Sequence, residues 1–277
     1  MKKKLALLLF TLPLFAVSQN SALFKYNFEP NHSYIQNIDQ KENNEIAYLG
    51  DSLFTQRLRE NKLKSYESSE SLQHIETLIK TDSIINDSIF RMVLEFIKTE
   101  DKNKKPIVSK GSRLSAHCNT HRFFPLIDSV SVLGKTKDNS QTIIELSKAA
   151  ILKFDFPENE LTIGEVFYRK YPALFPGKDN EQIVVTVVTG YKLLKIENGI
   201  GKFDIKQVYK INLGRSKVRP TITAEGKGTM YFDIKEHFYT KYELNTKLVY
   251  SVKREKYTVQ TTTNSTVNQK VIINEKK

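Results

Sequence analysis

The chain has 277 residues, a formal net charge of +12 and a single cysteine, Cys118. One cysteine excludes an intramolecular disulfide, so stability must come from a packed core, which a chain of this length can supply. Residues 191–277 contain 18 lysines and arginines against 8 acidic residues, an imbalance that favours contact with an anionic surface. The sequence contains no P-loop, dinucleotide-binding, G-x-S-x-G or H-E-x-x-H motif, which argues against those enzyme classes.

Residues 1–18 have the pattern of a secretory signal peptide. Three lysines at positions 2–4 precede an apolar run over residues 5–15, and small residues lead to an expected cleavage after Ser18. The run is shorter than the ~20 residues that cross a bilayer as a helix, so we expect no transmembrane segment in the mature chain. The sequence therefore predicts export to the periplasm, the cell surface or the medium. Expected partners there are lipid phosphate, acidic polysaccharide or acidic protein, and not nucleic acid.

The first half of the expected mature chain has mainly strand patterns. Residues 22–28 and 33–41 alternate on either side of a Pro30-Asn31 turn. Residues 84–98 fit either a strand or a helix by periodicity, and their β-branched content favours strands.

A polar run over residues 99–106 predicts a solvated loop and a domain boundary. It would divide an N-terminal β-rich region, residues 19–105, from a C-terminal β-meander region, residues 106–277. One continuous domain is the alternative. Within the second region, residues 140–150 predict a helix with Ser140 as its N-cap. Its apolar residues are Ile143, Ile144, Leu146 and Ala150.

Residues 182–196 and 201–212 form the clearest pair of strands. Asn198-Gly199 lies between them, and both residues accept the positive φ of a type I′ turn, which predicts a β-hairpin. Because the first strand is apolar on both faces, we expect it to be central in the sheet and covered on both sides. Gly190 within it predicts a bulge or a kink.

Three further strands are expected at about 219–234, 236–252 and 256–272. In the middle strand, apolar and polar side chains alternate over a length that would reach about 55 Å if the strand were straight, at ~3.3 Å per residue. The sheet must therefore bend. Residues 225–228 contain two glycines and predict a bulge, and Arg254-Glu255 predicts a turn. The final strand is polar on both faces and is therefore expected at an edge of the sheet.

The metal-type ligands cluster at one place, as His117, Cys118 and His121. On a helix the three could converge on a metal, and a thiolate beside a histidine could act as a nucleophile. On a strand, Cys118 and His117 point to opposite faces. The sequence offers no second cysteine and no identifiable orienting residue, so we favour a polar segment with a buried thiol. We predict no metal site, no cofactor and no catalytic residue.

Five basic residues around the end of the predicted hairpin form the candidate ligand-binding site. They are Lys206, Lys210, Arg215, Lys217 and Arg219. The spacing of two places the three from Arg215 onward on one face of an extended segment, where arginine can bind phosphate or carboxylate in bidentate fashion. The alternative is a charged hairpin tip that protects a sheet edge. The 13 tyrosines and 16 phenylalanines form the core or line a site for an apolar ligand.

Residues 154–167 (FDFPENELTIGEVF), the long strands after them and residues 226–233 (GKGTMYFD) resemble a family of exported Bacteroidetes proteins of unknown function. In that family a proline-led turn with a Gly-Asp pair and a tryptophan precedes a β-rich C-terminal half. Glu165 and Phe167 stand where the pattern more often has aspartate and tryptophan. The resemblance implies an envelope location and a β-rich fold, and it implies no activity.

Together these observations predict a mainly β (α+β) fold, with a long curved antiparallel sheet and one or two helices. The expected function is non-enzymatic. The protein would belong to the cell envelope and would bind an apolar or amphiphilic ligand in the curved sheet, or an anionic partner through its basic final third. The alternative is a structural or assembly factor whose edge strands pair with another envelope protein.

Overall fold

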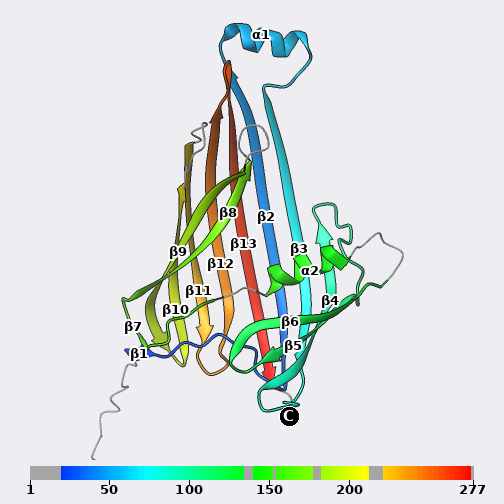
Figure 1. Ribbon diagram of the computed structural model, residues 1–277, viewed down its shortest axis with the longest axis vertical. Coiled ribbons are helices and arrows are strands. Elements are labelled where there is room, and N and C mark those ends of the chain that lie inside the picture. The colour runs from blue at the N-terminus through cyan, green and yellow to red at the C-terminus, as the bar shows by residue number, and fades with distance from the viewer. Residues whose placement is uncertain (1–19, 134–139, 152–153, 177–181, 212–220, 276–277) are drawn as a thin grey trace, which may run out of the picture.

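The computed structural model describes residues 20–133, 140–151, 154–176, 182–211 and 221–275 (Figure 1). The helices in these ranges are α1 (Ser52–Glu60) and α2 (Ser140–Ala150). The strands are β1 (Ser21–Ala22), β2 (His32–Gly50), β3 (Tyr66–Thr81), β4 (Ile89–Asp101), β5 (Arg113–Asn119), β6 (Arg122–Ser131), β7 (Leu161–Thr162), β8 (Val166–Pro176), β9 (Gln182–Glu197), β10 (Ile200–Ile211), β11 (Thr221–Asp233), β12 (Phe238–Lys253) and β13 (Tyr257–Glu275). The predicted helix at 140–150 is confirmed, and the strand interpretation of residues 84–98 is confirmed from Ile89 onward, whereas residues 84–88 form the turn before that strand.

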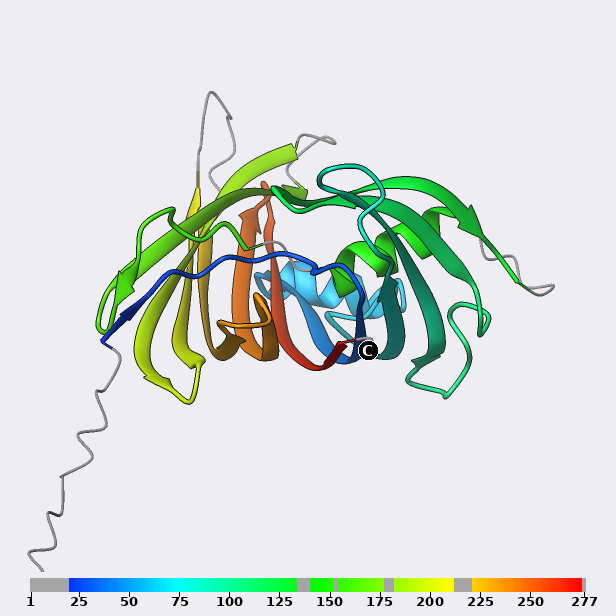
Figure 2. The same ribbon diagram turned by 90° about the horizontal axis from the view of Figure 1, so that it is seen from below.

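Eleven of the strands form one antiparallel sheet in the order β6-β5-β4-β3-β2-β13-β12-β11-β10-β9-β8. Two meanders, β2 to β6 and β8 to β13, are joined where β13 pairs with β2 along nineteen residue pairs. The end strands β6 and β8 do not pair with each other, so the sheet remains open and curls into a trough (Figure 2). The predicted long, curved antiparallel sheet is confirmed. β4 and β5, which lie on either side of residue 105, are hydrogen-bonded neighbours.

The N-terminal segment, residues 20–31, crosses the lower end of the trough as a strap (Figure 2). β1 pairs with the short strand β7, and the rest of the strap is extended without a strand partner. Alternate side chains enter the trough, and Phe24, Tyr26 and Phe28 are all buried. The expected strand at 22–28 is therefore wrong beyond Ala22, because this segment fills the trough instead of extending the sheet.

The core lies between the strap, α2 and the lower part of the inner face, meaning the concave face of the sheet. Its largest fully buried side chains are mostly aromatic: Tyr34, Tyr239, Phe24, Phe28, Phe90, Phe96, Phe203, Phe232 and Phe238. α2 packs into the trough through Ile143, Leu146 and Ala150. The lower trough is thus filled by the protein's own aromatic side chains.

A row of polar or glycine residues crosses the inner face above this core. Through consecutive strand pairings the row runs Arg169, Thr189, Gln207, Gly226, Thr246, Ser265, Glu42 and Ser71. Above the row, a second and smaller apolar cluster lies on the β9 and β12 side: Ile183, Val185, Leu248, Tyr250 and Val252. The polar row therefore separates two apolar clusters.

Two glycines on the inner face of β11 allow the sheet to curl tightly. A Cβ atom at Gly228 would collide with the carbonyl oxygen of Glu243, and one at Gly226 would lie 2.8 Å from the Gln207 side chain. The expected bulge at residues 225–228 is wrong, because the register is continuous there and shifts instead at Tyr231/Phe232. The register is also continuous at Gly190, so no bulge forms there.

The upper end of the sheet is a single layer. β13 lies between β12 and β2, so its predicted position at a sheet edge is wrong. None of residues 257–268 is buried. The polar composition of β13 reflects the fact that both of its faces reach solvent in this region. Its side chains form cross-strand hydrogen bonds, such as that from Thr263 Oγ1 to Asn44 Oδ1 at 2.6 Å.

Helix α1, which the sequence pattern had not indicated, lies at the upper tip between β2 and β3 (Figure 1). Asp51 caps it by accepting a hydrogen bond from the Phe54 N–H at 2.7 Å. The ring of Phe54 stacks on Tyr257 with centroids 4.7 Å apart. In the described ranges, neither helix has the length and apolar character that a membrane span requires.

Candidate functional site

The structure describes two of the five predicted basic site residues. Lys206 and Lys210 both lie on β10 and both are exposed. They point to the outer face, meaning the convex face, because the alternating residues Phe203, Ile205 and Gln207 are buried inside. Arg215, Lys217 and Arg219 lie outside the described residues.

The outer face of β8 to β10 carries apolar side chains beside these lysines. They are Val166, Tyr168, Leu174, Val184, Val188 and Val208. Strand pairing aligns them in short rows, with Val208 opposite Val188 and Val184 opposite Leu174. Tyr168 is opposite Gly190, whose missing side chain leaves room for the tyrosine ring. We call this set, with its lysines, the outer apolar face.

Most of the outer apolar face is open to solvent. Tyr168 is 66% exposed and Leu174 is 61% exposed, while Val188 at the centre is buried. The expectation that β9 would be covered on both sides is therefore wrong. Its inner face is buried in the trough, but no described element covers its outer face. Contiguous exposed apolar side chains on a protein surface mark sites of interaction.

The lysines of the outer apolar face are Lys170, Lys192, Lys206 and Lys210. All four are exposed, and none forms an ion pair with a described residue. The acidic residues at the margin of this face are Asp204 on β10 and Glu225 on β11. The carboxylate of Glu225 is already paired with Lys227 at 3.3 Å. The face is therefore positively charged as well as apolar.

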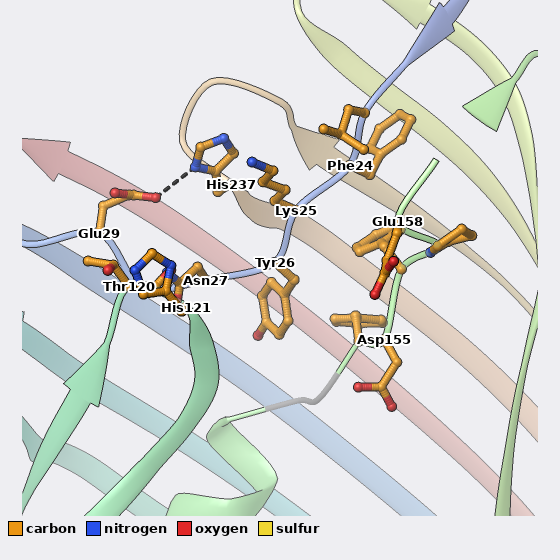
Figure 3. A pocket seen from close by; sticks show the side chains of 14 residues that line it. Phe24, Lys25, Tyr26, Asn27, Glu29, Thr120, His121, Asp155, Glu158 and His237 are labelled. Atoms are coloured by element: carbon orange, nitrogen blue, oxygen red, sulfur yellow. Dashed lines mark hydrogen bonds and ion pairs between the residues drawn. The ribbon is translucent and has the colours of Figure 1, made fainter. Parts of the chain in front are cut away.

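A cleft of about 780 Å³ lies at the lower end of the molecule, along the strap (Figure 3). Four chain segments line it: the strap from Leu23 to Glu29, the β5–β6 turn at Thr120 and His121, residues 154–158, and His237 in the β11–β12 turn. Sequence reasoning missed this cleft, because its residues are scattered over more than 200 positions and no local pattern connects them.

One end of the cleft carries basic and hydrogen-bonding groups from the strap and two turns. His237 Nδ1 donates a hydrogen bond to Glu29 Oε1 at 2.7 Å. This hydrogen bond outweighs the opposing effect of burial and holds the pKa of Glu29 below its ordinary value of 4.5. Asn27 ties the strap to both turns, through its N–H to His237 O at 3.0 Å and its Nδ2 to Thr120 O at 2.9 Å.

The other end carries the carboxylates of Asp155 and Glu158, which Figure 3 shows on the far side of Tyr26 from His237 and His121. Between the two ends lie aromatic residues of the strap and of the segment after α2: Phe24, Tyr26, Phe154 and Phe156. The cleft thus has an aromatic middle, a basic end and an acidic end.

The His117, Cys118 and His121 cluster is separated by the fold. Cys118 points into the core from β5, where burial raises the pKa of its thiol to about 12. His117 points outward to Asp128, with His117 Nδ1 2.6 Å from the carboxylate. His121 lies in the following turn. The described residues include no cluster of three or more side chains arranged to hold a metal ion.

No protein-family model matches the sequence, and no curated protein matches it either.

Proposed function

We propose that this is a non-catalytic binding protein of the cell envelope that docks on an anionic, amphiphilic surface, the headgroup region of a phospholipid membrane. The observation that carries the proposal is the outer apolar face, on which exposed apolar side chains alternate with lysines that have no ion-pair partner among the described residues. Surface binding to anionic lipid needs this combination of buried apolar area and positive charge.

The magnitudes favour lipid over a purely ionic partner. Each lysine near an anionic membrane contributes about 1 kcal/mol, and this term falls off within a Debye length of ~8 Å. Burial of apolar surface adds roughly 25 cal/mol per Å², which salt does not screen. Leu174 and Tyr168 offer this apolar contribution at the very edge of the sheet. A partner that presents only charge would leave it unused.

The alternative role, pairing through an edge strand with another envelope protein, has less support. β8 is the end strand beside this face, and Pro172 lies within it. Proline has no N–H to donate to an added strand and is a common means of blocking edge pairing. The lysines and apolar side chains, including those of the end strand β8, project from the outer face of the sheet and not in the direction in which an added strand would form hydrogen bonds.

Vesicle co-sedimentation tests the charge component of the proposal. The expected mature chain, residues 19–277, should sediment with vesicles of phosphatidylcholine and phosphatidylglycerol, and much less with phosphatidylcholine alone. The double variant Lys206→Glu/Lys210→Glu should lose most of this binding. Its matched control is Lys247→Glu/Lys253→Glu, which makes the same charge change at exposed positions on β12. Equal losses in both variants would mean that net charge, and not this face, is responsible.

A second pair of variants tests the apolar component. Leu174→Ser removes an exposed apolar side chain from the outer apolar face, and Leu49→Ser removes one at the tip of β2, where the side chain is 50% exposed. We expect only Leu174→Ser to weaken vesicle binding in high salt, where the ionic contribution is screened. Unchanged binding by Leu174→Ser would overturn the lipid-docking proposal.

A further inference from the structure

The cleft along the strap is a second site, at the lower end of the sheet and made of different residues from the outer apolar face (Figure 3). Its volume of about 780 Å³ lies within the range of roughly 300–1,000 Å³ that is typical of ligand pockets. Asn27 links the strap to the turns on both sides through backbone and side-chain hydrogen bonds. The walls are therefore held in place before any ligand arrives, which lowers the entropic cost of binding.

The basic end presents donors that the protein does not use itself. The side chains of Lys25 and His121 form no hydrogen bond or ion pair with other described residues, and both are exposed. His237 is already held by Glu29 through Nδ1, and the Nε2 of its neutral ring is an acceptor, so the donors open to a carboxylate are those of Lys25 and His121. A carboxylate that enters between these groups would accept charge-assisted hydrogen bonds, which are the stronger kind.

The acidic end presents the opposite charge. Glu158 is exposed and has no hydrogen-bond or ion-pair partner in the described part of the chain, whereas Asp155 already has an interaction partner of its own. A ligand ammonium group is the natural counter-ion for Glu158. The aromatic residues between the ends can pack against an apolar or aromatic ligand body.

From this arrangement we infer that the cleft binds a short peptide with free termini, its carboxylate toward Lys25 and His121 and its ammonium toward Glu158. The separation of the charged ends by aromatic residues selects a zwitterion whose charges lie at the two ends of an extended body. A phosphocholine headgroup does not meet this requirement. Its phosphate and ammonium lie close together, and its quaternary ammonium cannot donate a hydrogen bond to a carboxylate.

Titration of the full chain with the tripeptide Ala-Phe-Ala, followed by calorimetry and by NMR shifts of the Lys25 to Glu29 amides, tests the inference. The free peptide should bind, and its N-acetylated and C-amidated forms should each bind at least about tenfold more weakly. Glu158→Gln should weaken the free peptide by about tenfold and leave the acetylated peptide unchanged. The double variant Lys25→Met/His121→Gln should likewise weaken binding of the free peptide, but it should leave binding of the amidated peptide unchanged.

The control variant is Glu255→Gln, an exposed glutamate in the β12–β13 turn at the other end of the sheet, which should bind like the native chain. Blocked peptides that bind as tightly as the free one would overturn the inference, and so would the absence of binding by the free peptide. Shifts of the strap amides with short-chain phosphatidylcholine but not with peptide would assign the cleft to a lipid headgroup instead. Each of these results is independent of vesicle docking through the outer apolar face.

Discussion

Glu29 and His237 are 208 positions apart in the sequence, yet their side chains are joined by a hydrogen bond of 2.7 Å. A second pair runs the other way beside it, between His32 Nε2 and Glu236 Oε2 at 3.2 Å. The strap side and the β11–β12 turn thus each supply one histidine and one carboxylate. These reciprocal pairs clamp the strap across the lower end of the trough.

The clamp predicts a dependence of stability on pH. Because His237 lowers the folded-state pKa of Glu29, this contribution is fully present above the ordinary pKa of 4.5 and is lost as the pH falls through the lower folded value. Glu29→Gln should therefore reduce the free energy of unfolding by about 1 to 2 kcal/mol at about pH 5.5, and by much less at about pH 3. Urea unfolding at the two pH values measures this difference. A deficit of the same size at both would contradict the prediction.

Gly228 predicts a large steric effect. Its Cβ would meet backbone, the Glu243 carbonyl, which cannot move without disturbing the β11–β12 ladder. Gly228→Ala should cost about 3 kcal/mol or more. The comparison is Gly199→Ala, where φ is +77° but no atom lies within 4 Å of the new Cβ, so only backbone strain of about 1 kcal/mol is expected. If Gly199→Ala lowered the urea midpoint more than Gly228→Ala, the close approach between β11 and β12 at Gly228 would not be a steric constraint on the fold.

Gln207 anchors the polar row on the inner face. Its Nε2 donates to Tyr171 Oη at 3.0 Å and Thr189 Oγ1 at 3.1 Å, and its Oε1 accepts from Tyr209 at 2.9 Å. Gln207→Met keeps the volume but leaves these partners unsatisfied, which should cost about 2 kcal/mol in the free energy of unfolding. Gln260→Met on solvent-accessible β13 is the control and should change stability by less than about 0.5 kcal/mol. Equal effects would refute the network.

Cys118 should be unreactive in the folded protein. Burial raises the pKa of its thiol to about 12, so almost no thiolate is present at about pH 8. Iodoacetamide should label the native chain far more slowly than the urea-unfolded chain, as measured by intact mass. Rapid labelling of the native protein would show an accessible thiolate and would revive the alternative of a nucleophilic cysteine.

Much of the local structure could be predicted from the sequence, because it depends on neighbouring residues. The Asn198-Gly199 turn has the expected positive φ at both residues, 50° and 77°. The helix at Ser140–Ala150 has the predicted bounds. Lys206 and Lys210 share a face of β10, as alternation requires.

The position of each strand in the sheet could not be predicted in the same way. β13 is polar on both faces yet central, and β9 is apolar on both faces yet has an uncovered outer face. The pattern of side chains along a strand indicates which environment each of its faces can tolerate. The position of that strand in the sheet depends on which distant strand supplies its hydrogen bonds. For β13 that partner is β2, more than 200 residues away.

By itself, the sequence determined strands, turns, one helix and the basic character of the final third, since these follow from composition and from contacts over a few residues. Tertiary structure alone decided that the strap fills the trough, that the outer apolar face is exposed and that the cleft has two charged ends. Each of these features depends on residues brought together from distant parts of the chain by sheet curvature, and that curvature depends on close approaches such as the one at Gly228.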